Sequence, residues 1–172
     1  ARTKYFAEEM LRDVTDFRVI ILRIFNPIGT HMSGLLGEDP SKPQINILTL
    51  FAKAAVEKSN LVISPCVRDF IHIEDVAEAH IAALKQLNEI EELKIYNIGS
   101  GRGTSLIKLM EVFEATSGCK IPFKIKPCDE SEIKEIYADT TLASCELKWK
   151  SKRSIEEMCT DCWRFISNLN KN

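Results

Sequence analysis

Arg68 is a candidate for binding a phosphate group. It follows a turn at Pro65, and its planar guanidinium could hold two phosphate oxygens at once. The alternative is a surface ion pair with Asp69 or Glu74, and spacing alone favours that alternative. The local sequence around Arg68 therefore leaves both interpretations open.

Asn26 and Lys4 are the other two polar candidates. Asn26 ends a β-branched, apolar run, and ligands of open α/β sheets gather outside the carboxyl ends of the strands. A turn-forming asparagine before Pro27 is an equally good interpretation. Lys4 lies near the start of an amphipathic helix, where a cation is poorly placed relative to the helix dipole, so its local sequence indicates a solvated lysine.

A glycine-rich turn at positions 99–103, Gly-Ser-Gly-Arg-Gly, follows a strand and precedes a helix, which is the setting of a dinucleotide-binding loop. The full fingerprint requires its third glycine where Thr104 stands, and an acidic residue about 20 residues later. The spacing therefore favours a tight strand-to-helix turn, in which Gly99 could let a ligand or a second backbone approach closely.

Cys159 and Cys162 form a C-x-x-C spacing inside a segment with helical periodicity. A thioredoxin-like pair should open a helix, and a zinc site needs a second pair of ligands, which the other cysteines and the three histidines do not supply at short spacing. We therefore expect packing on a helix face, reduced thiols and no metal site.

Composition limits the classes of partner. The chain has 23 basic and 25 acidic side chains, a net charge of -2 and no block of like charges, so nucleic acid is not an expected partner. The apolar stretch 19–22 is broken by Arg23, far below the roughly 18 residues that span a bilayer, so no membrane partner is expected.

Alternating periodicities predict the elements that position these residues. Apolar residues at helical spacing predict helices, and apolar or β-branched runs predict strands, the one at 17–25 being buried on both faces. We expect helices at 3–14, 45–57, 74–87, 105–118, 139–147 and from 154 onward, and strands at 17–25, 61–63, 70–73, 93–98 and 122–126. This alternation indicates a mainly parallel α/β fold in one compact unit, 1–172.

Read together, the weak motifs form one ordered pattern. The segments, in chain order, are Leu-Arg-Ile-Phe-Asn-Pro-Ile-Gly at 22–29, Gly-Glu-Asp-Pro at 37–40, Val-Arg-Asp-Phe-Ile-His-Ile-Glu-Asp-Val-Ala at 67–77 and Ile-Tyr-Asn-Ile-Gly-Ser-Gly at 95–101. This order resembles the extended short-chain dehydrogenase/reductase family over essentially the whole chain. Within the family the match is closest to the UDP-glucose 4-epimerases, because of the Gly-Glu-Asp-Pro element.

The resemblance implies an NAD-dependent isomerase that interconverts UDP-glucose and UDP-galactose through a 4-keto sugar, in the cytoplasm. It also implies that 1–26 supplies the last helix and strand of a Rossmann domain and that the rest is the smaller nucleotide-sugar domain. In such enzymes a Tyr-x-x-x-Lys pair supplies the base. Lys4 matches the lysine, and the tyrosine would fall one place before Ala1. We therefore expect the chain to be the second half of an epimerase, its Rossmann half being the missing partner, and to be inactive and without NAD on its own.

The resemblance also assigns site residues by motif position. Lys4, Ile24 and Phe25 fall beside the cofactor. The positions that fall on the nucleotide sugar are Phe25, Asn26, Asn46, Ile47, Arg68, Phe70 and Glu132. Helices like the one that carries Lys4 often form dimer interfaces in this family, so a homodimer through Tyr5, Phe6 and Met10 is a further expectation.

Three departures from the family pattern keep alternatives open. Ile24 replaces a usual tyrosine, residues 64–66 shorten a polar loop, and Asp129 replaces an arginine of the phosphate clamp, of which Glu132 keeps only the carboxylate. An aspartate beside a diphosphate is repulsive. The alternatives are a non-catalytic, epimerase-like paralogue used for binding or assembly, and another nucleotide-sugar dehydratase or decarboxylase.

Overall fold

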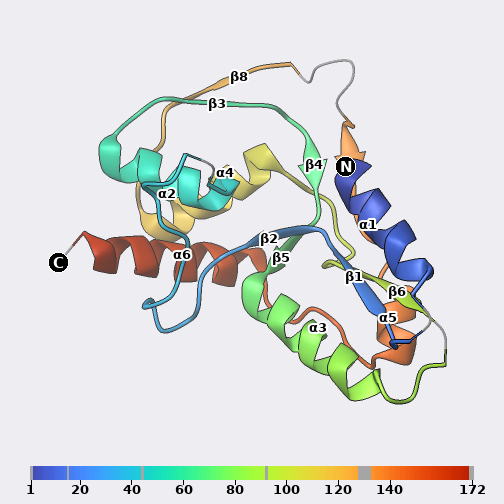
Figure 1. Cartoon of the computed structure of the whole chain (residues 1–172). Helices are drawn as coiled ribbons and strands as arrows, with labels where there is room; N and C mark the ends of the chain where they lie inside the picture. The colour runs from blue at the N-terminus through green and yellow to red at the C-terminus, as the bar shows by residue number, and fades with distance from the viewer. Residues whose placement is uncertain (1, 15, 44, 92, 128–132, 171–172) are drawn as a thin grey trace.

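The computed structural model describes residues 2–14, 16–43, 45–91, 93–127 and 133–170 (Figure 1). The helices are α1 (Arg2–Arg12), α2 (Ile47–Glu57), α3 (Ile73–Gln86), α4 (Leu106–Ser117), α5 (Thr141–Glu146) and α6 (Ile155–Leu169). The strands are β1 (Ile20–Ile24), β2 (Asn26–Ile28), β3 (Leu61–Ile63), β4 (Val67–Arg68), β5 (Phe70–His72), β6 (Lys94–Ile98), β7 (Thr104–Ser105), β8 (Phe123–Ile125) and β9 (Glu135–Ile136). The predicted α/β alternation is confirmed.

Most strand pairs are parallel, and neighbouring strands are distant in sequence. β1 pairs with β6, β2 with β5 and β3 with β8, all in parallel. β4 lies between β7, which is antiparallel to it, and β9, which is parallel. Because parallel strands need crossover connections, helices or long loops separate each pair along the chain.

The larger apolar core lies among α2, α4 and α6. Figure 1 shows α6 running beneath α2 and α4. Phe113 on α4 contacts both Phe51 on α2 and Trp163 on α6 in edge-to-face geometry, with ring centroids 6.2 and 5.9 Å apart. These aromatic contacts hold α2 against α4 and α6, and so fix the position of the first residues of α2.

Local capping explains where several helices begin and end. Ser105 caps α4, whose end at Gly118 has the left-handed conformation that glycine adopts without strain. Ser154 and Glu157 form the predicted capping box of α6, so the Cys159–Cys162 spacing does lie within a helix. The predicted limits of α4 and the predicted start of α6 are therefore confirmed to within a residue or two.

The prediction that strand 17–25 is buried on both faces is wrong. β1 covers only Ile20–Ile24, all of its residues are half-buried or exposed, and Phe17 is exposed. Ile20 and Leu22 pack toward the smaller core beside α3, whereas Arg23 on the opposite face binds Glu8 of α1. Among the described residues, β1 pairs only with β6, so one edge of this apolar strand is left uncovered.

α1 contributes no buried residue, although its sequence is amphipathic. Tyr5, Phe6 and Met10 are all exposed, and Figure 1 shows the helix lying along the outside of β1 and β6. Within the described residues, no helix is both long enough and apolar enough to span a membrane.

Candidate functional site

A cavity of about 720 Å³ opens at the carboxyl end of β1 and beside β2. Its walls come from six parts of the chain: the β1–β2 junction, the loop after β2, the start of α2, the β4–β5 segment, the start of α3 and the start of α4. The lining residues are Phe25, Asn26, Pro27, Ile28, Gly29, Leu36, Gly37, Glu38, Asn46, Ile47, Arg68, Phe70, Ile73 and Leu106. This is the position at which open parallel sheets bind ligands.

A change of strand partner creates the floor of the cavity. The Phe25 N–H donates to Ile98 on β6, and the next N–H, that of Asn26, donates to the Asp69 carbonyl beside β5. The chain therefore leaves one parallel neighbour for another between these two residues. Strands that separate in this way open a crevice between them, so Phe25 and Asn26 come to line it.

The Asn26 side chain has a fixed orientation. Its Nδ2 donates to the Asp69 carbonyl oxygen at 2.9 Å, beside the main-chain bond to the same oxygen. Because the nitrogen is engaged, the Oδ1 atom is the end of the amide available to accept a hydrogen bond; no described residue donates to it. An acceptor at this point suits a ligand hydroxyl.

Asn46 caps α2 at the opposite wall. Its Oδ1 accepts from the N–H groups of Leu48 and Thr49, and both its own N–H and its Nδ2 donate to Glu38 Oε2 at 2.8 Å. The Asn46 side-chain oxygen is thus fully used within the protein. The first helical peptide, that of Ile47, stays at the positive end of α2, where an anion is favoured.

Glu38 is a cavity residue that the sequence analysis did not single out as a site residue, although it lies in the Gly-Glu-Asp-Pro element. Its carboxylate is already bound to Asn46, so it orders the start of α2. The sequence feature that could have indicated Glu38 is its acidic side chain, eight residues before Asn46 at the start of a predicted helix.

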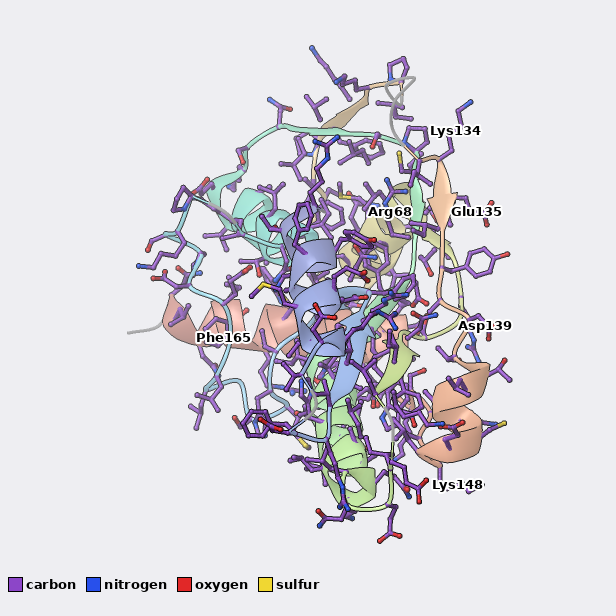
Figure 2. The ribbon with its side chains drawn as sticks, turned by 45° about the vertical axis from the view of Figure 1, so that its right-hand side comes forward. Arg68, Lys134, Glu135, Asp139, Lys148 and Phe165 are labelled. Atoms are coloured by element: carbon purple, nitrogen blue, oxygen red, sulfur yellow. The ribbon has the colours of Figure 1, made fainter. Side chains whose placement is uncertain are left out.

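Arg68 reaches the cavity from β4, between the flanking strands β7 and β9. Figure 2 shows it beside the strand that carries Glu135. Its Nη1 donates to the Val67 carbonyl oxygen at 2.8 Å, which holds the guanidinium against its own strand. The adjacent Phe70 is buried on β5 and anchors this segment to the larger core.

Three of the assigned residues do not come together with this group. Lys4 is exposed on α1 and Ile24 is partly exposed at the end of β1, and neither is among the described residues that line the cavity. Glu132, like Asp129, lies outside the described residues. The cavity therefore unites Phe25, Asn26, Asn46, Ile47, Arg68 and Phe70.

The glycine-rich turn at 99–103 serves the protein's own chain. The N–H groups of Ser100 and Gly101 donate to the Asp69 carboxylate, at 2.7 and 2.9 Å. These N–H groups are therefore not available to a cofactor phosphate. The interpretation of this segment as a tight turn is confirmed, but the groups that approach Gly99 are the side chains of Asp69 and Ala138 rather than a ligand or a second backbone.

Similar proteins were found among both curated sequences and solved structures. The chain is 40% identical over 182 residues to UDP-glucose 4-epimerase 2 of Arabidopsis thaliana, covering 97% of this chain and 52% of that protein. It is also 40% identical to UDP-glucose 4-epimerase of Drosophila melanogaster, covering 96% of this chain and 52% of that protein. The chain thus spans about half the length of the curated relatives it matches.

Solved structures agree in fold. UDP-glucose-4-epimerase from Stenotrophomonas maltophila, with bound NAD and formylated UDP-arabinopyranose, superposes with a TM-score of 0.92 at 34% identity, over 99% of this chain and 55% of that one. UDP-glucose 4-epimerase from Bifidobacterium longum, in complex with NAD+ and UDP, gives 0.87 at 33% identity, over 97% and 54%. The expected fold, part of an extended short-chain dehydrogenase, is therefore confirmed.

The model of one family, the NAD dependent epimerase/dehydratase family, matches residues 1–99. This range includes β1, β2, β4 and β5, whose ends form the floor of the cavity, and the start of α2. The family match and the cavity thus rest on the same part of the molecule. The chain belongs to the NAD dependent epimerase/dehydratase family.

Proposed function

We propose that this chain forms the nucleotide-sugar-binding part of a UDP-glucose 4-epimerase, which interconverts UDP-glucose and UDP-galactose. The observation that carries the proposal is the single cavity that places Arg68 and the N-terminus of α2 together with Asn26 at the ends of parallel strands. A nucleoside diphosphate sugar needs these two kinds of contact, cations or helix N–H groups for its phosphates and hydrogen-bonding groups for its hydroxyls.

The binding energy falls mainly on the diphosphate. Arg68 supplies a guanidinium and Ile47 lies at the positive end of α2, whereas Asn26 offers one amide oxygen to the sugar. An epimerase needs this imbalance, because the flat 4-keto sugar must turn over while the nucleotide stays bound. We infer that Glu132, outside the described residues, adds a carboxylate near Arg68 or the ribose.

The residues present fit one end of NAD. Phe25 lines the cavity floor, and Lys4 stands exposed on the helix outside β1 with no hydrogen bond or ion pair to another described residue. We propose that Lys4 would hold the hydroxyls of the nicotinamide ribose and that Phe25 and Ile24 would contact the nicotinamide, although only Phe25 lines the described cavity. The chemistry that NAD supplies when bound is reversible removal of hydride from sugar C4. The turn at 99–103 does not fit the cofactor pyrophosphate, because its N–H groups bind Asp69.

Lys4 has a second task in this proposal. A cation close to a tyrosine lowers the pKa of the phenol toward the working pH, where the phenolate can accept the proton of the sugar 4-hydroxyl.

The exposed, apolar side chains of Tyr5, Phe6 and Met10 on the same helix support a homodimer of the complete protein. We propose a cytoplasmic location and a role in galactose metabolism for it.

Titration of UDP into the complete protein tests the binding half of the proposal. We expect UDP to bind, and Arg68→Gln to weaken binding at least tenfold, because a charge-assisted contact to phosphate is lost. Arg102→Gln is the matched control, since Arg102 is an exposed arginine that does not line the cavity, and it should change the dissociation constant less than twofold. Conversion of UDP-galactose to UDP-glucose by the NAD-loaded protein tests the reaction. A protein that binds UDP without turnover, or one that binds no UDP, would overturn the enzymatic proposal and favour the non-catalytic paralogue.

A further inference from the structure

The Asp69 side chain is a buried carboxylate that the proposed function does not use. It is fully buried, and it accepts hydrogen bonds from four groups: the N–H and hydroxyl of Ser100 and the N–H groups of Gly101 and Ala138. A buried carboxylate is tolerated when its oxygens are satisfied in this way. Its partners come from the turn after β6 and from the segment after β9.

Those two segments flank the strand that carries Arg68. On β4, Arg68 lies opposite Thr104 of β7 on one side and opposite Ile136 of β9 on the other. The turn that Asp69 binds leads directly into β7, and Ala138 lies two residues beyond β9. One carboxylate therefore ties both neighbours of β4 to the residue next to Arg68.

The main chain of Asp69 holds Asn26, the cavity residue on the proposed sugar side. Its carbonyl oxygen accepts from both the N–H and the Nδ2 of Asn26. The residue thus connects Asn26, on the proposed sugar side, with Arg68, on the proposed phosphate side, without itself lining the cavity.

The packing around Asp69 leaves no room for a side chain at position 99. A Cβ atom added to Gly99 would lie 2.5 Å from Asp69 Oδ2 and 2.7 Å from the Ala138 side chain. The φ of Gly99 lies outside the left-handed region, so the glycine is needed for space. The close approach that a glycine permits here is that of the Asp69 carboxylate.

We propose that Asp69 is the positioning residue of this site, setting Arg68 and Asn26 at the separation that a nucleoside diphosphate sugar requires. The inference rests on the proposed function and deepens it. Asp69 touches no ligand; its carboxylate fixes the β7 and β9 strands around Arg68 while its peptide fixes the amide of Asn26.

The test compares two buried aspartates in the complete protein. Asp75 is also fully buried and accepts two main-chain N–H groups, but it orders the chain before α6 and does not line the cavity. Asp69→Asn should weaken UDP binding at least tenfold. Asp75→Asn should change the dissociation constant for UDP less than twofold, even if it lowers the melting temperature as much as Asp69→Asn does. If the role of Asp69 is merely structural, the two variants should have similar dissociation constants.

A double-mutant cycle with Arg68 supplies the second readout. Because Asp69 acts through Arg68, adding Asp69→Asn to Arg68→Gln should weaken UDP binding by less than a further twofold. If Asp69→Asn does not fold, Gly99→Ala and Ser100→Ala disturb the same carboxylate more gently and should each weaken binding by at least threefold. Wild-type protein that binds no UDP overturns the proposed function and this inference with it. Wild-type protein that binds UDP, with variants at 69, 99 and 100 that bind as tightly, overturns this inference alone.

Discussion

The guanidinium of Arg153 lies against the carboxylate of Asp75, and the N–H groups of Lys152 and Arg153 donate to the same carboxylate at 3.1 and 3.0 Å. Asp75 is in the first turn of α3, and Arg153 immediately precedes the capping residue of α6. Glu74 and Glu78 also bind Arg153. This cluster joins the smaller core beside α3 to the helix that supports the cavity.

Replacing Arg153 by methionine should lower the free energy of unfolding by about 2–4 kcal/mol, because the buried Asp75 carboxylate loses its cation and Glu74 and Glu78 remain beside it. Urea titration followed by circular dichroism measures the change. Arg12→Met is the control, since Arg12 pairs with Glu9 on the exposed face of α1 and should cost less than about 0.5 kcal/mol. Equal losses for the two variants would contradict the structural role of the cluster.

Cys159 and Cys162 should resist alkylation in the folded protein. Burial raises the pKa of both thiols to about 12, so the thiolate that reacts is scarce at pH 8. Iodoacetamide labelling followed by peptide mass spectrometry should modify the exposed Cys145 and leave the pair unmodified until urea is added. Rapid labelling of the pair without denaturant would instead support a redox role for the C-x-x-C spacing.

Gly99→Ala and Gly118→Ala should destabilise the protein for different reasons. At Gly99 the new methyl group meets Asp69 and Ala138 in a packed region, which should cost about 2–3 kcal/mol. At Gly118 there is open space, and only the positive φ of +71° opposes alanine, which should cost about 1 kcal/mol. Thermal unfolding of the two variants ranks the costs, and the reverse order would show that the Asp69 carboxylate can move.

Local chemistry explains which elements could be predicted from the sequence. Ser105, Gly118 and the Ser154–Glu157 pair act on peptide groups a few residues away, so the limits of α4 and α6 follow from neighbouring residues. The strands β4, β7 and β9 have two residues each and exist only because they pair across more than 30 residues of sequence. Periodicity cannot reveal elements of that length.

The candidate site was predictable only in part for the same reason. Arg68 and Asn26 stand in motifs, but their relation through Asp69 depends on a partner change between Phe25 and Asn26 that no local pattern encodes. The prediction that strand 17–25 is buried on both faces was wrong because an apolar run does not indicate which side of a strand finds a partner. In β1, Ile20 and Leu22 face the smaller core, whereas the outer face and one edge of the strand are not covered by any described strand.

His72 should make stability depend on pH below neutrality. The ring is fully buried, and its Nδ1 accepts from the Glu74 N–H, so the neutral form fits the fold. Burial is the main cause that lowers the pKa of His72 below 6.5; Arg153, before α6, acts in the same direction, while Glu74 on α3 and Asp161 on α6 oppose it. Nε2 lies 3.3 Å from Asp161 Oδ2 but outside hydrogen-bond geometry, so this carboxylate offsets only part of the loss of water.

As the pH falls below about 6.5, the unfolded chain takes up a proton at His72 that the folded protein does not, so the free energy of unfolding should fall, by at most about 1.4 kcal/mol per pH unit. His72→Asn keeps an acceptor for the Glu74 N–H and removes the titrating group. Urea titrations between pH 7 and 5.5 should therefore show a shallower slope for this variant than for wild type. His80→Asn, at an exposed position on α3, is the control and should keep the wild-type slope. Parallel slopes for wild type and His72→Asn would mean that the ring is protonated in the folded protein as readily as in the unfolded chain.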